Sequence, residues 1–174
     1  RLRKGEITFY NLDGEEIQKE LTEIKWDAQA AEKAGFEHFM MKEIHEQPKA
    51  VRDTVNSVLK NGTIDLSEMG LSTERICQIS QIYIVACGSA YHVGVAAQYA
   101  IEDLSKIPVR VELASEFRYR KPLLDPNGLV VIVSQSGETA DSLAALREAK
   151  SKGIETLAIV NVVGSSIARE ADHV

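Results

Sequence analysis

The sequence predicts an α/β protein built on a doubly wound parallel sheet, with helices on both faces in three layers. One observation is that the sequence contains four apolar segments of strand length, rich in β-branched residues, at 82–88, 109–113, 129–134 and 155–160. The other is that apolar residues at helical spacing follow these segments after short polar turns. Strands that alternate with helices in this way form parallel sheets, because each crossover returns the chain to the same edge.

The N-terminal residues predict a short strand pair. Residues 7–10 have strand character, Asp13-Gly14 is a strong turn signal, and residues 16–25 are expected to return as a second strand. One hairpin cannot form a hydrophobic core of its own. We therefore expect residues 1–26 to be the tail of a preceding domain or a linker.

Residues 27–61 favour helices. An apolar stripe at helical spacing, which we expect to face a core, consists of Phe36, Phe39, Met40 and Ile44. Pro48 suits the first turn of a further helix. Asn61-Gly62 is expected to end that helix. Next, Ser72 or Thr73 is expected to cap a short amphipathic helix, in which Cys77 is a packing residue.

The helices of the sheet region follow in order. Residues 89–92 are expected to form a turn before a helix at 93–104, and Ser115 is expected to cap a helix at 116–120. The helix after strand 129–134 ends at Gly153, and a short helix covers 167–171. Another strand is predicted to begin at 172–174. Because the chain also starts without Met, we expect it to be a piece of a longer protein.

Composition excludes several classes of protein. The net charge of −6 and the pI of about 5.3 disfavour a nucleic-acid surface. No run of 18 apolar residues predicts a membrane span, and no signal peptide is visible. The two cysteines, Cys77 and Cys87, have no metal-ligand spacing, which favours a reduced, cytoplasmic compartment and no metal site.

The turn after strand 129–134 carries the clearest functional signal. It reads Ser134-Gln135-Ser136-Gly137-Glu138-Thr139, and a helix follows at once. Ligands of open α/β sheets bind at such turns, and unpaired amides at a helix start favour an anion. There is no lysine and no Gly-x-Gly-x-x-Gly, which excludes a nucleotide P-loop and a dinucleotide fingerprint. These hydroxyls suit a single phosphate held without metal or cofactor, or they are plain turn and cap residues.

Other residues join this edge of the predicted sheet. Gly88-Ser89 follows the first strand of the sheet, and Ser165 follows the fourth, where it either lines the same rim or is an N-cap. Cys87 is interpreted as a packing residue, since a nucleophile needs a partnered base, for which His92 is the nearest candidate. Glu138 is either an acid/base or a cap.

Two groups of sequence motifs in this chain resemble the motifs of a known family. Ser134–Thr139, with Ala86-Cys87-Gly88-Ser89, resembles the sugar isomerase (SIS) phosphosugar-binding domain, a flavodoxin-like three-layer fold. Ala-Ser-Glu-Phe-Arg-Tyr-Arg at 114–120 and Met-Lys-Glu-Ile-His-Glu-Gln-Pro at 41–48 narrow the resemblance to the glutamine–fructose-6-phosphate aminotransferases, from about Ile7 onward. Such proteins have a glutaminase domain followed by two SIS domains.

The resemblance implies a reaction and a set of substrate-binding residues. In the family, ammonia from glutamine is passed to fructose 6-phosphate, which becomes glucosamine 6-phosphate. The implied phosphosugar-binding positions are Gly88, Ser89, Ser134, Gln135, Ser136, Gly137 and Thr139. One departure is Ser89-Ala90, where the family often has Thr-Ser, so the hydroxyl at 89 is kept and the hydroxyl at 90, with any sugar or phosphate contact it makes in the family, is lost.

The resemblance also implies how the chain is divided. Residues 1–26 would be the glutaminase tail and linker, 27–80 a helical linker and entry, and 81–174 a truncated first SIS domain. The family's nucleophilic cysteine, its acid/base residues in the second SIS domain and its Schiff-base lysine lie outside this chain. We therefore expect the chain to bind a sugar phosphate but not to catalyse, and to form a homodimer.

Two other functions are weighed against this one. A stand-alone SIS phosphosugar sensor predicts a DNA-binding helix-turn-helix before the sheet and a basic surface, and residues 1–80 show neither. A dinucleotide enzyme needs a glycine fingerprint that is absent.

Overall fold

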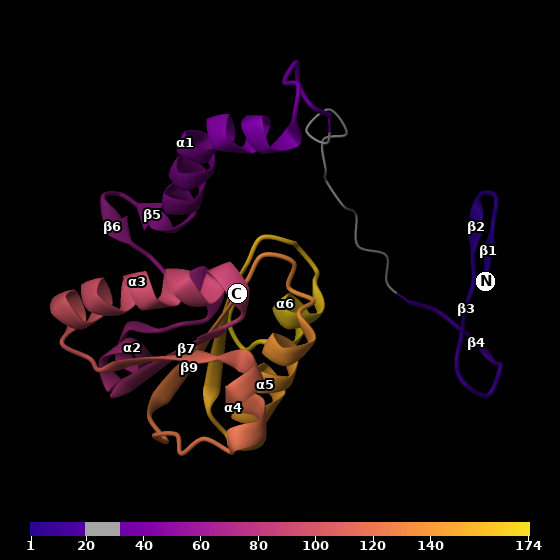
Figure 1. The fold of residues 1–174 in the computed structure, drawn as a ribbon. Helices are drawn as coiled ribbons and strands as arrows, with labels where there is room; N and C mark the ends of the chain where they lie inside the picture. Colours follow the sequence, from indigo (N-terminus) through magenta and orange to yellow (C-terminus); the bar gives the residue numbers. More distant parts are fainter. Residues whose placement is uncertain (20–31) are drawn as a thin grey trace. The chain divides into compact units, whose positions relative to one another are not determined.

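The computed structural model describes residues 1–19 and 32–174, which belong to two compact units, Arg1–Ser57 and Val58–Val174. The first unit opens with two small antiparallel hairpins (Figure 1). One pairs β1 (Leu2–Arg3) with β2 (Glu6–Ile7), and the other pairs β3 (Phe9–Tyr10) with β4 (Glu16–Ile17). The predicted turn at Asp13-Gly14 is confirmed. The return strand is β4, and the rest of its predicted range, from residue 20, lies outside the described residues.

A single helix, α1 (Phe39–Val58), replaces the two helices predicted on either side of Pro48. That prediction was wrong, because a proline inside a helix removes one hydrogen bond and bends the axis without always ending it. The ribbon of α1 bends partway along its length (Figure 1). The expectation of a buried stripe was also wrong, since Phe39 and Met40 are 52% and 72% exposed.

The second unit opens with a hairpin of β5 (Leu59–Lys60) and β6 (Thr63–Ile64). Asn61 and Gly62 form its turn, with φ of 52° and 79°, and do not cap a helix as predicted. Asn-Gly with two positive φ angles is the preferred two-residue hairpin turn. The 3₁₀ helix η2 (Ser67–Met69) and α2 (Thr73–Gln78) follow. Ser72 caps α2 as predicted, but Cys77 is exposed instead of packed.

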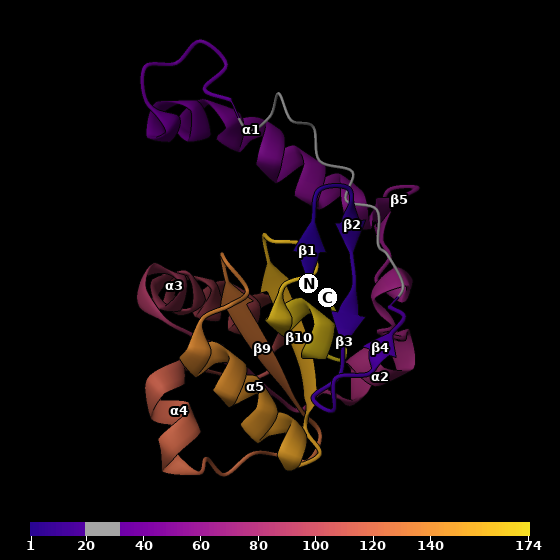
Figure 2. The same cartoon turned by 90° about the vertical axis from the view of Figure 1, so that its right-hand side faces the viewer.

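A four-stranded parallel sheet forms the centre of this unit, as predicted (Figures 1 and 2). Its strands are β7 (Gln81–Ala86), β8 (Val109–Leu113), β9 (Gly128–Ser134) and β10 (Glu155–Val160), in the spatial order β10-β9-β7-β8. The first two strands in the chain occupy one half of the sheet and the next two the other. The direction of winding therefore reverses between β7 and β9, as in doubly wound folds.

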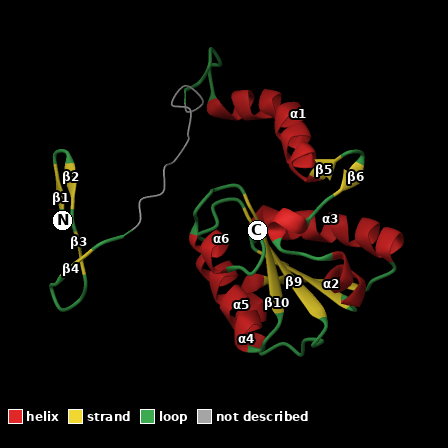
Figure 3. Ribbon diagram, turned by 180° about the vertical axis from the view of Figure 1, so that it is seen from behind, coloured by secondary structure: helices red, strands yellow, loops and turns green. Residues whose placement is uncertain are grey.

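Helices cover both faces of the sheet (Figure 3). One face packs against α3 (Gly88–Ser105), and the other packs against α4 (Ala114–Arg120), α5 (Ala140–Ser151) and α6 (Ser166–Glu170). Alternate strand residues enter each layer, so Ile84 and Val131 face α3 while Val85 and Ile132 face the other helices. Complete burial of a side chain such as Ile132 stabilises the fold by roughly 1.5–3 kcal/mol.

Two helix starts differ from the prediction. Helix α3 begins at Gly88, directly after β7, so residues 89–92 are its first turns and not a separate loop. Helix α4 begins at Ala114, which places Ser115 inside the helix instead of at its cap. Beyond α6, His173 forms a parallel bridge with Leu157 of β10, as expected for a segment that begins another strand.

Candidate phosphate site

The carboxyl ends of the four strands meet at one edge of the sheet. Ala86 of β7 pairs in register with Leu113 of β8 and with Val133 of β9, and Ser134 pairs with Val160 of β10. The segments that follow these strands therefore emerge side by side. The structure thus gathers the three predicted segments, 88–89, 134–139 and 164–166, at one edge.

The turn after β9 is closed by its own hydroxyls. Ser134 is only 5% exposed, and its Oγ accepts a hydrogen bond from the Gly137 amide at 3.1 Å. The Oγ of Ser134 also lies 3.4 Å from Oγ1 of Thr139. Ser136 Oγ accepts from the Glu138 amide at 3.2 Å. Because Ser136 uses its oxygen as an acceptor in this amide bond, its hydroxyl proton remains available to a ligand, while either Ser134 or Thr139 donates in the contact between them.

None of the four helices that begin at this edge, α3 to α6, receives a hydrogen bond from the side chain of its own N-cap residue. Cys87 before α3 and Thr139 before α5 make no capping hydrogen bond, whereas Ser72 does cap α2 at 3.2 Å. The first amides of a helix have no partner within the helix. They carry partial positive charge, which favours an anion. Gly88 and Ser89 lie in the first turn of α3, where Ser89 is exposed, as is Gln135 of the turn after β9.

The turn is tied to α6. The Ile167 amide donates to the Gly137 carbonyl at 3.0 Å, and the Ser166 amide donates to Oε1 of Glu138 at 2.7 Å. Hydrogen bonding to Ser166, first through its side chain and then through its amide, lowers the pKa of the Glu138 carboxyl, with a smaller contribution from Arg169. Glu138 therefore caps α6, and not its own helix α5. Sequence reasoning missed this contact because the two residues are 28 positions apart.

Ser165 lies against the same turn. It is 3% exposed, it makes no capping bond to α6, and its Oγ has no hydrogen-bond partner. A Cβ at position 137 would lie 2.0 Å from that oxygen, so only glycine fits there. Ser165 thus packs behind the turn and fills the space beside Gly137.

Neither the cysteine nor the basic residues form a catalytic group here. Cys87 packs against the hydrophobic core, and its sulfur accepts a weak hydrogen bond from Ser142, a buried residue that sequence reasoning did not single out. His92 is exposed and makes an edge contact with the Tyr91 ring. Arg118 donates to Asp141 at 2.7 Å, which holds α4 against the start of α5.

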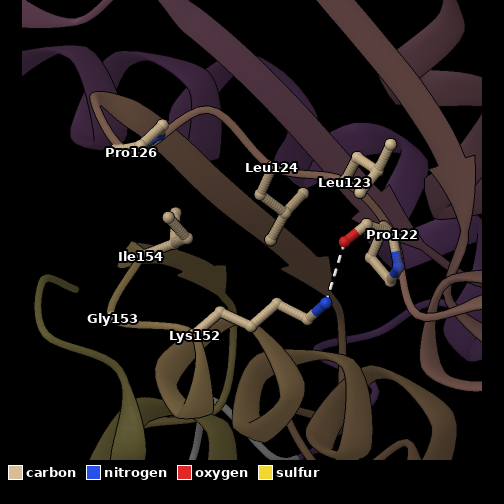
Figure 4. A pocket seen from close by; sticks show the side chains of 7 residues that line it. All are labelled: Pro122, Leu123, Leu124, Pro126, Lys152, Gly153 and Ile154. Atoms are coloured by element: carbon tan, nitrogen blue, oxygen red, sulfur yellow. Dashed lines mark hydrogen bonds between the residues drawn. The ribbon is translucent and has the colours of Figure 1, made fainter.

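A pocket of about 280 Å³ lies at the opposite end of the sheet, near the starts of β9 and β10 (Figure 4). Prolines and leucines form much of its wall, and the amine of Lys152 donates to the Pro122 carbonyl at 2.9 Å. This pocket has no hydroxyl-bearing side chain, and its one charged side chain is engaged. The carboxyl edge of the sheet is therefore the better candidate site.

The described residues contain neither a metal-binding cluster nor a membrane-spanning helix. Within residues 1–19 and 32–174, no group of three or more His, Cys, Asp or Glu side chains has the arrangement of a metal site. In the same part of the chain, no helix has the length and apolar character needed to cross a membrane.

The fold and this edge define a class of protein. Residues 75–174 match the SIS domain family, and the chain belongs to that family. Within it, the chain is 57% identical over 169 residues to the glutamine–fructose-6-phosphate aminotransferase (isomerizing) of Clostridium acetobutylicum. The corresponding protein of Clostridium tetani is 52% identical over 174 residues. These matches cover 97% and 99% of this chain but only 28% and 29% of the relatives.

A solved structure agrees with this assignment. The C-terminal domain of the glucosamine-fructose-6-phosphate aminotransferase from Francisella tularensis superposes with a TM-score of 0.75 at 44% identity. That match covers 81% of this chain and 40% of the other. The chain therefore spans less than a third of the curated relatives it matches and under half of this solved chain.

Proposed function

We propose that this chain is the sugar-phosphate-binding part of an aminotransferase that makes glucosamine 6-phosphate and glutamate from fructose 6-phosphate and glutamine. The observation that carries the proposal is the turn at 134–139, whose hydroxyl protons adjoin the uncapped start of α5. A phosphate there accepts hydrogen bonds without metal or cofactor. The proposed binding residues are Gly88, Ser89, Ser134, Gln135, Ser136, Gly137 and Thr139.

The domain assignment is part of the same proposal. Residues 1–26 form the end of a glutaminase domain and its linker, 27–80 a helical linker and entry to the SIS domain, and 81–174 the first SIS domain, truncated at its C-terminus. The match of residues 75–174 to the SIS family supports the last of these. Partners of this chain are then the glutaminase domain and the second SIS domain of the parent protein, with a second copy in a cytoplasmic homodimer.

Catalysis is proposed to need those other parts. The described residues at the carboxyl edge supply hydroxyls and amides, and the carboxylate of Glu138 is engaged with α6. We therefore expect no glucosamine 6-phosphate from the chain alone. A coupled assay that detected this product would contradict the proposal.

A stand-alone SIS sensor is the second candidate, and the comparisons support it less. The identity of 57% extends over 97% of the chain, so it includes most of the segment before residue 75. A sensor that shared only the SIS domain with the aminotransferases would not match them there.

Titration of the chain with fructose 6-phosphate tests the proposed site. We expect saturable shifts in the amide resonances of residues 88–90 and 134–140, and none with NAD or with fructose. Ser136→Ala should weaken binding roughly tenfold, because it removes one charge-assisted hydrogen bond. The matched control is Ser151→Ala, because the Ser151 hydroxyl donates to the Glu148 carbonyl within α5, away from the proposed site. Equal affinity in both variants would contradict the assignment of the site.

A further inference from the structure

A carboxylate in a turn that binds phosphate needs an explanation, because two negative charges repel each other. Glu138 lies between Gly137 and Thr139, in the middle of the proposed site. Its Oε1 does not remain free, because it accepts the Ser166 amide proton at 2.7 Å. Arg169, whose guanidinium donates to the Gly164 carbonyl and to Ser166 Oγ, adds positive charge nearby.

The same contact replaces a missing cap. Ser165 is the N-cap residue of α6, yet its hydroxyl makes no capping bond and lies buried beside Gly137. The turn at 134–139, here called the phosphate turn, instead accepts from the first two amides of α6. The Gly137 carbonyl accepts one of these hydrogen bonds and the Glu138 side chain accepts the other. The bends at 135–137 belong to no helix or strand, so these two bonds hold the turn from behind.

We propose that Glu138 is a positioning residue that anchors the phosphate turn to α6 and so fixes the hydroxyls of Ser136 and Thr139 for the sugar phosphate. This inference rests on the proposed function and deepens it. This role differs from the acid/base role considered from the sequence, because Oε1 of the carboxylate acts as an acceptor for a main-chain amide. The anchoring is assigned to the hydrogen bond, so glutamine, which keeps a carbonyl oxygen at the same place, is expected to substitute for glutamate.

Three variants of the full chain, titrated with fructose 6-phosphate, separate the hydrogen bond from the charge. Glu138→Ala is expected to weaken binding roughly fivefold, because a turn without this anchor no longer holds its hydroxyls in one arrangement for the ligand. Glu138→Gln should retain the affinity of the unmodified chain or exceed it, since it keeps the acceptor and removes the repulsion. Ser166→Pro removes the donor and should weaken binding as much as Glu138→Ala. Proline is tolerated at the first residue of a helix, and Ser165 before it has φ −63° and ψ 164°, which suit a residue before proline.

Ser166→Ala keeps the amide that donates to Glu138 but removes the hydroxyl that also lowers the pKa of that carboxyl, so it should weaken binding less than Ser166→Pro. The double variant Glu138→Ala/Ser166→Pro should be no weaker than either single variant, since both remove one interaction. Additive losses, or a Glu138→Gln variant as weak as Glu138→Ala, would overturn the proposal.

The amide resonance of Ser166 in the ligand-free chain reports on the anchor independently of binding. Glu138→Ala should shift this resonance upfield and speed its hydrogen exchange, with accompanying shifts across 135–139. If the resonances of Ser166 and of residues 135–139 did not change in Glu138→Ala, the proposed anchoring role of Glu138 would be overturned, even if the variant still bound the sugar phosphate. A different result would separate the two proposals. If the unmodified chain bound no fructose 6-phosphate, but Glu138→Ala still shifted the Ser166 and turn resonances, the proposed function and the role of Glu138 in it would be overturned. The contact between Glu138 and α6 would remain established.

Discussion

At the scale of single residues, the carboxyl edge is built by close packing as much as by polar contacts. Gly137 has a φ of 65°, a conformation that glycine adopts readily, and the Ser165 side chain occupies the space where a Cβ would lie. Ser134 forms the hydrogen bond that closes the turn while almost fully buried. Gly137 and the buried Ser134 therefore set the shape of this turn, while Ser165 packs behind it.

Gly137→Ala should destabilise the chain by about 2–3 kcal/mol, since it combines backbone strain with a clash. Gly164→Ala is the matched control, because Gly164 has a similar φ of 71° but an added Cβ would meet nothing within 4 Å, so we expect a loss of about 1 kcal/mol. Urea unfolding gives both values. Adding Ser165→Gly to Gly137→Ala should recover part of the loss, and no recovery would show that strain alone is responsible.

At the scale of elements, the segment after α6 is fastened to β10 by a carboxylate. Asp172 Oδ2 accepts from both the amide and the hydroxyl of Thr156, at 3.0 and 2.7 Å, and Oδ1 accepts from Lys150 at 2.5 Å. Partial burial opposes ionisation of Asp172, but these hydrogen bonds outweigh it and lower its pKa. A lowered pKa in the folded state means that the ionised carboxylate stabilises the fold.

Asp172→Asn should therefore cost about 1 kcal/mol at pH 7, a value reduced by the partial exposure of the ion pair. The contribution is complete well above the ordinary pKa of 3.8 and is lost as the pH falls through that value towards the lower folded one. The difference in unfolding free energy between the two proteins should shrink over that range. Asp103→Asn, which loses only an exposed pair with Lys106 on α3, should show no such change, and a difference for Asp172→Asn that stayed constant with pH would contradict the prediction.

At the scale of the whole chain, the buried core belongs to one unit. Among the described residues, every buried hydrophobic side chain lies between Leu71 and Ile167, within the unit Val58–Val174. The unit Arg1–Ser57 contributes two hairpins and most of α1, whose apolar side chains are largely exposed. The stability of the sheet is therefore expected to be independent of residues 1–57.

A shortened chain that begins at Val58 should unfold at the same urea concentration as the full chain, with a free energy of unfolding within about 1 kcal/mol. Circular dichroism at both lengths measures this. A chain that ends at Glu170 is the informative contrast, because it loses Asp172 and the bonds of His173 to Met69 and Glu155, and it should unfold earlier. A large loss on removing residues 1–57 would contradict the prediction.

The order of strands and helices from 81 to 174, the parallel sheet and the polar turn at 134–139 were predictable from the sequence alone. The central strands β7 and β9 are largely buried, and apolar residues recur at helical spacing in the helices, so local pattern and burial agree. The prediction was wrong at residues that can play either of two structural roles in their local sequence. Pro48 opens or bends a helix, Asn61-Gly62 ends a helix or turns a hairpin, and Ser115 caps a helix or continues it. Only the neighbouring elements choose between such uses.

Only the tertiary structure decided the partners of Glu138, Ser165 and Asp172. Each acts on a residue 16–28 positions away, and such distances leave no periodic signal in the chain. The sequence by itself determined which segments become strands and helices, because burial and backbone propensity act over a few neighbouring residues. Packing of those elements then determined which hydroxyls and amides remain free at the carboxyl edge, because hydrogen bonds between distant segments exist only once the sheet has formed.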